Sequence, residues 1–322
     1  MTDVVALGEI LIDFTFAGKT ADGKNIYEEN PGGAPANCAC AVAKLGGKAA
    51  FVGMTGCDSF GEDLKNTLKD LNVDVSGMRT TGKQHTTLAF VSLDANGERN
   101  FSFCRNPGAD TQLSEADLDM GLLKGTKILH VGSLSLTDQP AKSSTLKAIE
   151  VVKKAGGLIS YDPNWRANLW KGRSDAMAEL KSLFKYADIV KVSDEELKLL
   201  FGEVSCEEGA EKIHAEGVKL VLITLGAKGV YYSAKTSGLV ANGTISVPKV
   251  KVADTTGAGD SFNGGLLFRL TRREKPLSFT AEELVQDINF ANSVASLCVT
   301  KRGAIPALPT LEETEAFVKA NY

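Results

Sequence analysis

The chain has 322 residues, which is enough for one large α/β domain or two average domains with a substantial buried core. Its 43% hydrophobic and 24% charged residues are typical of a soluble globular protein. The net charge of −4, without clusters of Lys and Arg, excludes the broad positive field that drives nonspecific binding to nucleic acid or anionic membranes. We therefore expect small-molecule partners.

The sequence has no apolar run near the roughly 18 residues that a membrane span needs. Its first residues also lack the charged, apolar and small-residue regions of a signal peptide. The six cysteines are scattered, with no C-x-x-C pair, and only three histidines accompany them. We expect a cytoplasmic protein with free, mostly buried thiols.

Short apolar runs recur along the chain, separated by amphipathic stretches. The first, "VVALGEILIDF", predicts a buried strand that breaks at Gly8 and places Asp13 just beyond its end. Similar strands are predicted at 49–56, 127–133, 157–163, 188–193 and 219–226. A helix is predicted over 141–157, where basic residues and glycine close the pattern. This alternation predicts an α/β fold with a parallel sheet covered on both faces.

Two stretches break that alternation. Residues 86–106 alternate apolar and polar side chains around Asn96-Gly97, which predicts an antiparallel hairpin. Residues 14–31 are too polar for the core. Together they predict a small β lid on a single domain that spans 1–322.

The stretch "DTTGAGDSFNGG" at 254–265 follows the strand-like run "ISVPKVKV" and precedes an apolar run. It predicts a tight turn at Gly257-Ala258-Gly259 and a helix that begins near Asp260 or Ser261. Unpaired amides and the positive end of the helix dipole would then face one point, which suits a phosphate.

Asp260 lies at the mouth of that turn. A carboxylate there would repel a bare phosphate, which favours a second role: accepting the proton of a hydroxyl that attacks phosphorus. The alternative is that Asp260 caps the helix, because Asp is a preferred N-cap residue. The stretch is neither a Walker A loop nor a dinucleotide fingerprint.

A second glycine-rich motif, "NPGGAPANCACAVAKLGG", covers 30–47. Gly32-Gly33 predicts a turn, and Pro35 suits the first turn of a short, closely packed helix. Asn37 is the polar residue on that helix, and its amide matches a polyol hydroxyl. Alternatively, Asn37 only braces neighbouring loops.

Further polar residues follow predicted strands, where open α/β sheets bind their ligands. Arg166 in "YDPNWRANLW" could hold phosphate or an oxygen-rich ligand, or form a surface salt bridge. Glu196 in "VSDEEL" could organise hydrated Mg²⁺, or serve the helix dipole like many acidic residues at helix starts. Thr224 and Gly226 in "TLGAKG" could allow close approach of a nucleotide.

Taken together, these motifs resemble the ribokinase-like (PfkB-type) carbohydrate kinases along essentially the whole chain. Both glycine-rich motifs occur in the order and spacing of that family. Within it, "GEILIDF", "GGAPAN", "RNPGAD", "YDPNWR" and "TLGAKG" are most similar to fructokinases. The resemblance implies a three-layer α/β/α ribokinase-like fold with a mostly parallel sheet, sugar under a β lid and ATP across the carboxyl edge of the sheet.

The resemblance also implies roles for individual residues. Asp260 matches the catalytic base, and the amides of Gly257, Ala258 and Gly259 match the anion hole. The matching sugar-site positions are Asp13, Gly32, Gly33, Asn37, Phe103, Arg105 and Arg166. The matching nucleotide-site positions are Thr224, Gly226, Gly229 and Asn292, with Glu196 for Mg²⁺ and its waters.

Members of the family often bind a monovalent cation, usually K⁺, and the matching positions here are Asp254, Thr256, Gly303 and Ala307. One position departs from the family pattern. Its Asn-x-x-Glu motif reads Ser193-Asp194-Glu195-Glu196, so any contact specific to the asparagine is absent.

The expected activity is transfer of the γ-phosphoryl group of ATP to a primary hydroxyl, with D-fructose giving fructose 6-phosphate. The alternative substrate is 2-keto-3-deoxygluconate, because its kinases share the "DPN-x-R" pattern. A nucleoside kinase and a catalytically silent sugar-binding protein fit the motifs less well. Lid edges and the aromatic residues Phe101 and Phe103 favour a homodimer through the lid.

Overall fold

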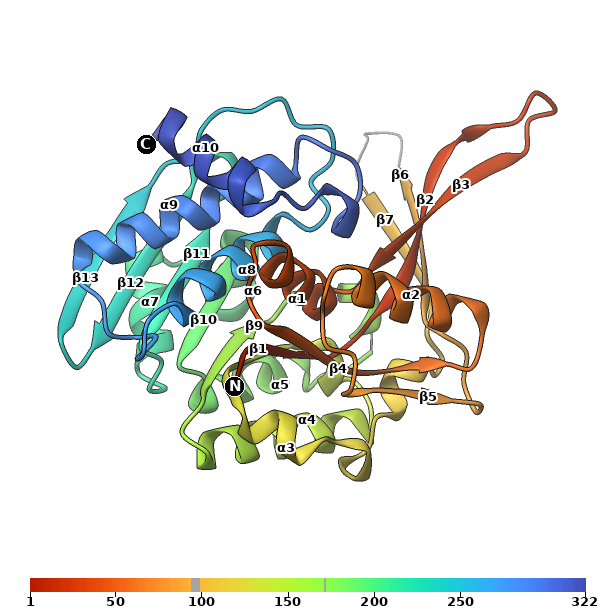
Figure 1. Ribbon diagram of the computed structural model, residues 1–322, viewed down its shortest axis with the longest axis horizontal. Helices are drawn as coiled ribbons and strands as arrows, with labels where there is room; N and C mark the ends of the chain where they lie inside the picture. The colour runs from red at the N-terminus through yellow and green to blue at the C-terminus, as the bar shows by residue number, and fades with distance from the viewer. Residues whose placement is uncertain (94–98, 171) are drawn as a thin grey trace.

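The computed structural model describes residues 1–93, 99–170 and 172–322 (Figure 1). Over these residues the chain forms a large sheet between two layers of helices, with a second, small sheet beside it. The predicted α/β fold with a mostly parallel sheet is confirmed.

The large sheet has nine strands in the described part of the chain. In spatial order they are β13 (Leu239–Ile245), β12 (Val230–Thr236), β11 (Leu220–Thr224), β10 (Ile189–Ser193), β9 (Leu158–Asp162), β8 (Thr126–Gly132), β1 (Thr2–Leu7), β4 (Ala49–Gly56) and β5 (Met78–Thr81). The pairs from β11 to β5 are parallel, and β12 and β13 add an antiparallel edge. All residues of β4 are buried, as expected for a strand covered on both faces.

Helices pack on both faces of this sheet (Figure 1). One face carries α1 (Ala34–Lys44), α2 (Ser59–Asp70), α8 (Ala258–Thr271) and α9 (Ala281–Cys298). The other carries α3 (Met120–Lys124), α4 (Ala141–Lys154), α5 (Ala176–Ser182), α6 (Asp194–Phe201) and α7 (Cys206–His214). Short 3₁₀ turns occur at Ala109–Gln112, Glu115–Asp117, Leu134–Leu136, Ala167–Leu169, Phe184–Tyr186, Gly226–Lys228 and Ile305–Ala307. The last helix, α10 (Leu311–Asn321), packs outside α9 through Leu311 and Val318.

Strand β1 shows how the sequence builds both cores. Val4 and Ala6 pack with α1 and α8, whereas Val5 and Leu7 pack with the opposite layer. Successive side chains of a strand point to opposite faces, so an unbroken apolar run fits a strand buried on both sides.

The glycine pair at the end of "DTTGAGDSFNGG" joins three helices. A Cβ on Gly264 would lie 2.4 Å from Ala41 Cβ, and one on Gly265 would lie 2.9 Å from Val294 Cγ2. Helix α8 therefore lies close against both α1 and α9, and this contact sets the position of its N-terminus.

The small sheet contains β3 (Asn25–Gly32), β2 (Leu11–Lys19), β6 (Leu88–Leu93) and β7 (Arg99–Cys104), in that order. Strands β6 and β7 pair antiparallel, as the hairpin prediction requires, while the predicted Asn96-Gly97 turn lies outside the described residues. Strands β2 and β3 extend away from the main body (Figure 1).

Two local predictions were wrong. Asp13 does not follow the first strand but lies within β2, opposite Asn30 and Ala89, because the chain leaves the large sheet after Leu7 and starts a new strand at Leu11. The run "ISVPKVKV" is not a strand beyond Ile245, since Pro248 has no N–H to donate to a ladder. The helix predicted to begin near Asp260 is confirmed as α8, which begins two residues earlier, at Ala258, after Gly257 in a left-handed conformation with φ 75°.

Among the described residues, no helix combines the length and apolar character that crossing a membrane requires.

Candidate active site

A cavity of about 910 Å³ lies beyond the carboxyl ends of the parallel strands. Its walls come from the residues that follow β1, β9, β10 and β11 and from the first turns of α1 and α8. Ligand sites of open α/β sheets lie at this edge. The predicted site residues that line the cavity are Asp13, Gly33, Asn37, Phe103, Arg166, Glu196, Thr224, Thr256, Gly257, Ala258, Gly259 and Asp260.

The turn before α8 reaches the cavity wall with its backbone. Gly257 is the N-cap residue, and a Cβ there would lie 2.7 Å from Ala304 Cβ. The N–H groups of a first helical turn have no partner within the helix. Ala258 N donates to Thr255 O at 3.3 Å, a long contact. The turn thus provides an N-terminal helix dipole and backbone donors at the cavity.

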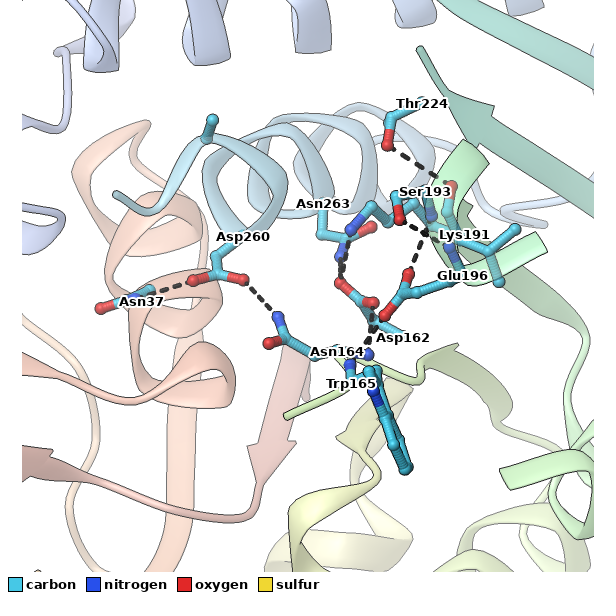
Figure 2. A network of polar contacts seen from close by, with 12 residues as sticks. Asn37, Asp162, Asn164, Trp165, Lys191, Ser193, Glu196, Thr224, Asp260 and Asn263 are labelled. Carbon is cyan, nitrogen blue, oxygen red and sulfur yellow. Dashed lines mark hydrogen bonds and ion pairs between the residues drawn. The ribbon is translucent and has the colours of Figure 1, made fainter. Parts of the chain in front are cut away.

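The contacts of Asp260 exclude one of its two predicted roles. Asp260 is the third residue of α8, and no side chain caps that helix, so the capping alternative is wrong. Its two carboxylate oxygens instead accept hydrogen bonds from Asn37 Nδ2 at 2.8 Å and Asn164 Nδ2 at 3.0 Å (Figure 2). Burial raises the pKa of Asp260 above its usual value, and the nearby charge of Asp162 raises it further. A raised pKa makes the carboxylate a stronger base.

Asn37 occupies a buried position on α1, where the helix starts after Gly33 and Pro35 lies in the first turn. Its Nδ2 is paired with Asp260, whereas its Oδ1 has no hydrogen-bond partner among the described residues. The bracing alternative therefore accounts for one end of this amide only. The other end is a buried acceptor at the cavity.

Lys191 and Asp162 form a buried ion pair beside the glycine turn (Figure 2). Lys191 Nζ lies 2.9 Å from Asp162 Oδ2, which also accepts from Asn263 Nδ2 at 2.8 Å. A Cβ on Gly259 would lie 2.8 Å from Lys191 Nζ, so the ammonium group lies directly against the turn. Burial alone would lower the pKa of Lys191, but the charges of Asp162 and Glu196 raise it, so the side chain remains a cation.

Glu196 and Ser193 form a capping box at the start of α6, so the serine at the family's asparagine position caps this helix. Glu196 Oε2 accepts from Ser193 N at 2.8 Å, and Oε1 accepts from Trp165 N at 2.7 Å (Figure 2). Burial and the charge of Asp162 raise the pKa of Glu196. This carboxylate ties the end of β10 to the segment after β9.

The predicted sugar-site positions of the first 40 residues lie together. A Cβ on Gly32 would lie 2.3 Å from Asp13 Oδ2, so Gly32 itself does not line the cavity but allows the carboxylate of Asp13 to do so. Gly33 has φ 109°, and a Cβ there would lie 2.5 Å from the carbonyl oxygen of Glu9. Glycine is required at both positions by close approach.

The two predicted arginines differ in placement. Arg105 is 6% exposed and is not among the described residues that line the cavity. Its guanidinium donates to Asp110 Oδ2, Thr137 Oγ1 and the carbonyl of Leu134. Arg166 is half-buried, lines the cavity and donates from Nη1 to Trp165 O at 3.0 Å. Arg105 therefore joins the end of β7 to the main domain, while Arg166 faces the ligand space.

The remaining predicted residues lie outside the cavity lining of the described structure: Gly226, Gly229, Asn292, Asp254, Gly303 and Ala307. Asp254 joins two of the loops concerned, since it accepts from Thr256 N at 2.9 Å and from Gly303 N at 3.0 Å. Asn292 is buried on α9, and its Nδ2 has no partner among the described residues. Over the described ranges, no group of three or more His, Cys, Asp and Glu side chains is arranged to hold a metal ion.

Several residues of this site were missed by the sequence analysis: Glu9, Asp162, Asn164, Lys191 and Asn263. Lys191 had a signal, because it is the one charged residue within the apolar run "IVKV". Asn164 has φ 46°, a conformation that asparagine tolerates better than most residues, but nothing in its sequence context predicts contact with Asp260.

Comparison with known proteins places the chain in a family. The model of the pfkB family carbohydrate kinases matches residues 1–311. Fructokinase-1 of Oryza sativa subsp. japonica is 45% identical over 310 residues, which cover 95% of this chain and 94% of the relative. The structure of a fructokinase from Xylella fastidiosa with bound ATP has a TM-score of 0.92 at 32% identity and covers 99% of both chains.

A second solved structure is a double mutant of the fructokinase from Vibrio cholerae, with fructose, ADP and potassium ion bound. It has a TM-score of 0.89 at 37% identity, over 99% of this chain and 98% of that one. From the full-length family match and these identities, the chain belongs to the pfkB family of carbohydrate kinases.

Proposed function

We propose that this protein transfers the γ-phosphoryl group of ATP to the primary C6 hydroxyl of D-fructose, giving ADP and D-fructose 6-phosphate. The observation that carries the proposal is the buried carboxylate of Asp260, held by two asparagines beside the N-terminal turn of α8. Relatives and solved structures at the identities given above are named fructokinases, which supports fructose as the sugar.

In the proposed reaction, Asp260 takes the proton of the attacking hydroxyl. The hydroxyl oxygen forms a bond to the γ-phosphorus, the bond from that phosphorus to the β-γ bridging oxygen breaks, and ADP leaves with the electron pair. Asn37 and Asn164 orient the carboxylate, and burial keeps its pKa raised, so that it is a competent base. The two amide donors also hold it ionised enough to accept a proton.

Charge on the transferring group is stabilised by the glycine turn and Lys191. Phosphoryl transfer depends mainly on positioning and on fixed charges that match the transition state. Backbone donors at Gly257, Ala258 and Gly259 supply one such set. The ammonium group of Lys191 lies against Gly259 and is held there by Asp162, so it needs little rearrangement when the phosphate arrives.

On the sugar side, Asp13, Gly33, Asn37 and Phe103 contact the ketohexose, and Arg166 lies near the sugar or the transferred phosphate. Their common lining of one cavity supports these roles. Arg105 acts indirectly, by fixing the base of the small sheet. The position of Arg105 away from the cavity disfavours 2-keto-3-deoxygluconate as the substrate. Recognition of this sugar acid would need the guanidinium group of Arg105 beside the carboxylate of the substrate.

The nucleotide lies toward Thr224, Gly226 and Gly229, and Asn292 lies near its adenine ring. Thr224 lines the cavity. A Cβ on Gly226 would meet no atom within 4 Å, which leaves room for a ligand, whereas one on Gly229 would lie 1.9 Å from the carbonyl oxygen of Ile245. Bound Mg²⁺ would neutralise charge on the phosphate oxygens. Glu196 would hold its waters from the cavity wall, although both carboxylate oxygens already accept backbone amides.

A potassium site is proposed at Asp254, Thr256, Gly303 and Ala307. Asp254 holds the loops around Thr256 and Gly303 together, which supports a shared ion site for their backbone oxygens. Removal of K⁺ at constant ionic strength would then lower kcat, and an unchanged rate in its absence would count against the site.

We also propose that the small sheet is a mobile lid and that two lids pair in a homodimer. Exposed apolar side chains on β3, Ile26 at 43% and Tyr27 at 38%, support a lid contact, whereas the side chain of Phe101 lies outside the described residues and Phe103 lines the cavity. Light scattering tests the dimer. A cytoplasmic location is part of the proposal, supported by six free cysteines.

The activity is tested by coupled ADP release with four substrates: fructose, ribose, 2-keto-3-deoxygluconate and adenosine. We expect the highest kcat/KM with fructose. A higher kcat/KM with 2-keto-3-deoxygluconate would make this sugar acid the substrate in place of fructose. If no substrate caused ADP release, the protein would instead be a catalytically silent sugar-binding protein.

A further inference from the structure

Two buried oxygen atoms on one side of the cavity lack hydrogen-bond partners among the described residues: Glu9 Oε2 and Asn37 Oδ1. Both side chains line the cavity and are 4% and 5% exposed. An unpaired buried polar atom costs free energy, so native proteins rarely leave one without a partner or a ligand. Hydrogen-bond donors from outside the chain would satisfy both atoms.

The carboxyl group of Glu9 is held in place before any ligand binds. Its Oε1 accepts from the N–H of Ala34, the first residue of α1, at 3.0 Å. The backbone of Gly33 packs against the carbonyl of Glu9, since even a Cβ there would lie 2.5 Å from that oxygen. With one oxygen fixed in this way, the position of the other is also defined, on a residue that lines the cavity.

The surroundings of Glu9 suit an uncharged polar ligand. Burial raises the pKa of Glu9 to about 7, and the charge of Asp110 raises it further. Hydrogen bonds from the N–H groups of Glu9 itself and of Ala34, and the charge of Arg105, oppose the shift. Either protonation state leaves a lone pair for a hydroxyl donor, and the neutral form can also donate. A sugar hydroxyl can meet both states, because it is both donor and acceptor.

We propose that Glu9 is a sugar-binding residue, whose Oε2 accepts a hydrogen bond from a hydroxyl of the sugar other than the one that Asp260 deprotonates. Asn37 Oδ1 receives a second hydroxyl in the same way. This contact rests on the proposed function, since it assumes that the cavity binds a ketohexose. It gives the acidic residue in "GEILIDF" a role that neither its sequence context nor the other motifs predict.

The first experiment measures fructose binding without nucleotide, through the fluorescence of Trp165 at the cavity wall. Glu9→Ala removes the acceptor, and fructose affinity should fall by about tenfold to hundredfold, the range for a hydrogen bond to an ionisable group. Glu9→Gln retains an oxygen for the Ala34 amide but places an NH₂ group at Oε2, so affinity should fall while the fold is preserved. The KM for ATP should change little in both variants.

The second experiment distinguishes a direct contact between Glu9 and the sugar from an indirect effect of Glu9 on the position of α1. Wild type and Glu9→Ala are titrated with fructose analogues that each lack one hydroxyl, at C1, C2, C3 or C4. If Glu9 binds a hydroxyl, the penalty of Glu9→Ala should disappear with the one analogue that lacks it and persist with the others. A residue that only supports α1 would impose the same penalty on every analogue.

Glu283→Ala is the matched control, because Glu283 also accepts from a backbone N–H at a helix N-terminus, that of Thr280, but is exposed and remote from the cavity. Its fructose affinity should equal that of wild type. Glu9→Ala within about twofold of wild type, or equal penalties with all analogues, would overturn the proposal. Wild-type binding without turnover would instead count against the proposed function, and absence of wild-type binding would overturn both.

Discussion

Two sides of the same cavity differ in how their polar groups are satisfied. One side, which we propose faces the phosphoryl group and call the phosphate side, is lined by Lys191 and Glu196. With Asp162 and Asn263 beside them, these side chains form hydrogen bonds and an ion pair with one another and with the backbone (Figure 2). On the sugar side, Glu9 and Asn37 each leave one buried oxygen without a partner in the described chain. The side chains on the phosphate side are paired with one another, whereas two oxygens on the sugar side have no partner in the described chain.

The difference follows from the chemistry of the two ligands. A transferring phosphoryl group is stabilised by charges that are already in place, because fixed dipoles need no reorganisation during the reaction. A sugar is recognised by its hydroxyl groups, and a site that leaves its own polar atoms unpaired rejects molecules that cannot pair them. Asn37, a proposed sugar-binding residue, also contacts Asp260, the proposed base, and so joins the two sides.

The largest effect is expected where the two sides meet. Asp260→Asn should lower kcat by about 10²-fold to 10⁴-fold, the scale of a lost general base, while fructose binding largely survives. Steady-state kinetics and the fluorescence titration measure the two quantities separately. Asp63→Asn, on an exposed face of α2, serves as the control. Near-normal turnover of Asp260→Asn would exclude Asp260 as the base.

The next effect isolates the phosphate side. Lys191→Met removes the cation beside Gly259, so kcat should fall by about 10²-fold to 10³-fold, the range for one lost transition-state donor, with fructose affinity unchanged. Lys191→Met also leaves the buried charge of Asp162 without its partner, which lowers stability. The double variant with Asp162→Asn removes that unpaired charge, so its kcat reports the loss of the cation alone. Lys219→Met is the control, because Lys219 pairs with Asp188 at the opposite ends of β10 and β11. If Lys191→Met lowered fructose affinity as much as kcat, the two sides of the cavity would not act independently.

On the sugar side, Glu9 should make stability depend on pH. Burial raises the pKa of Glu9 from 4.5 to about 7, so between these values the folded chain holds more protons than the unfolded chain. Stability from this group is full below about pH 4.5 and falls by about 3 kcal/mol as pH rises through 7. Denaturant unfolding of wild type and Glu9→Gln across this range should show that change in their difference. If the difference in unfolding free energy between wild type and Glu9→Gln did not change with pH, the raised pKa of Glu9 would be contradicted.

The smallest effect is expected for Arg166, which is half-buried at the cavity. Arg166→Ala should lower kcat/KM for fructose by about tenfold, as for one partly solvated charged hydrogen bond. If KM for fructose rises, Arg166 belongs to the sugar side; if only kcat falls, it belongs to the phosphate side. An unchanged kcat/KM would leave the surface salt bridge as its role.

The fold could be predicted because its signals are local. Apolar runs predicted β4, β8, β9, β10 and β11 within two residues of their ends, since a strand buried on both faces needs little beyond such a run. The strand predictions around Asp13 and Ile245 were wrong. The residue types alone do not show that the chain passes from the large sheet into the small one before Asp13, or that strand pairing ends at Ile245.

The site could be predicted only in part, for a similar reason. Glycine turns are visible in sequence because close approach demands glycine. The contacts of Asp162, Asn164 and Lys191 depend on three strand ends meeting, which only the sheet order determines. Arg105 was expected at the sugar, and only the placement of Asp110 and Thr137 reveals where its guanidinium points.

The hydrogen bond from Asn37 to Asp260 spans 223 residues of sequence. A chain emerging from the ribosome completes the Asn37 helix long before the segment that carries Asp260 has been synthesised. The nascent enzyme therefore has no oriented base and no glycine turn until nearly five-sixths of the chain is made and α8 docks on α1. The two halves of this contact therefore meet only late in the synthesis of the chain.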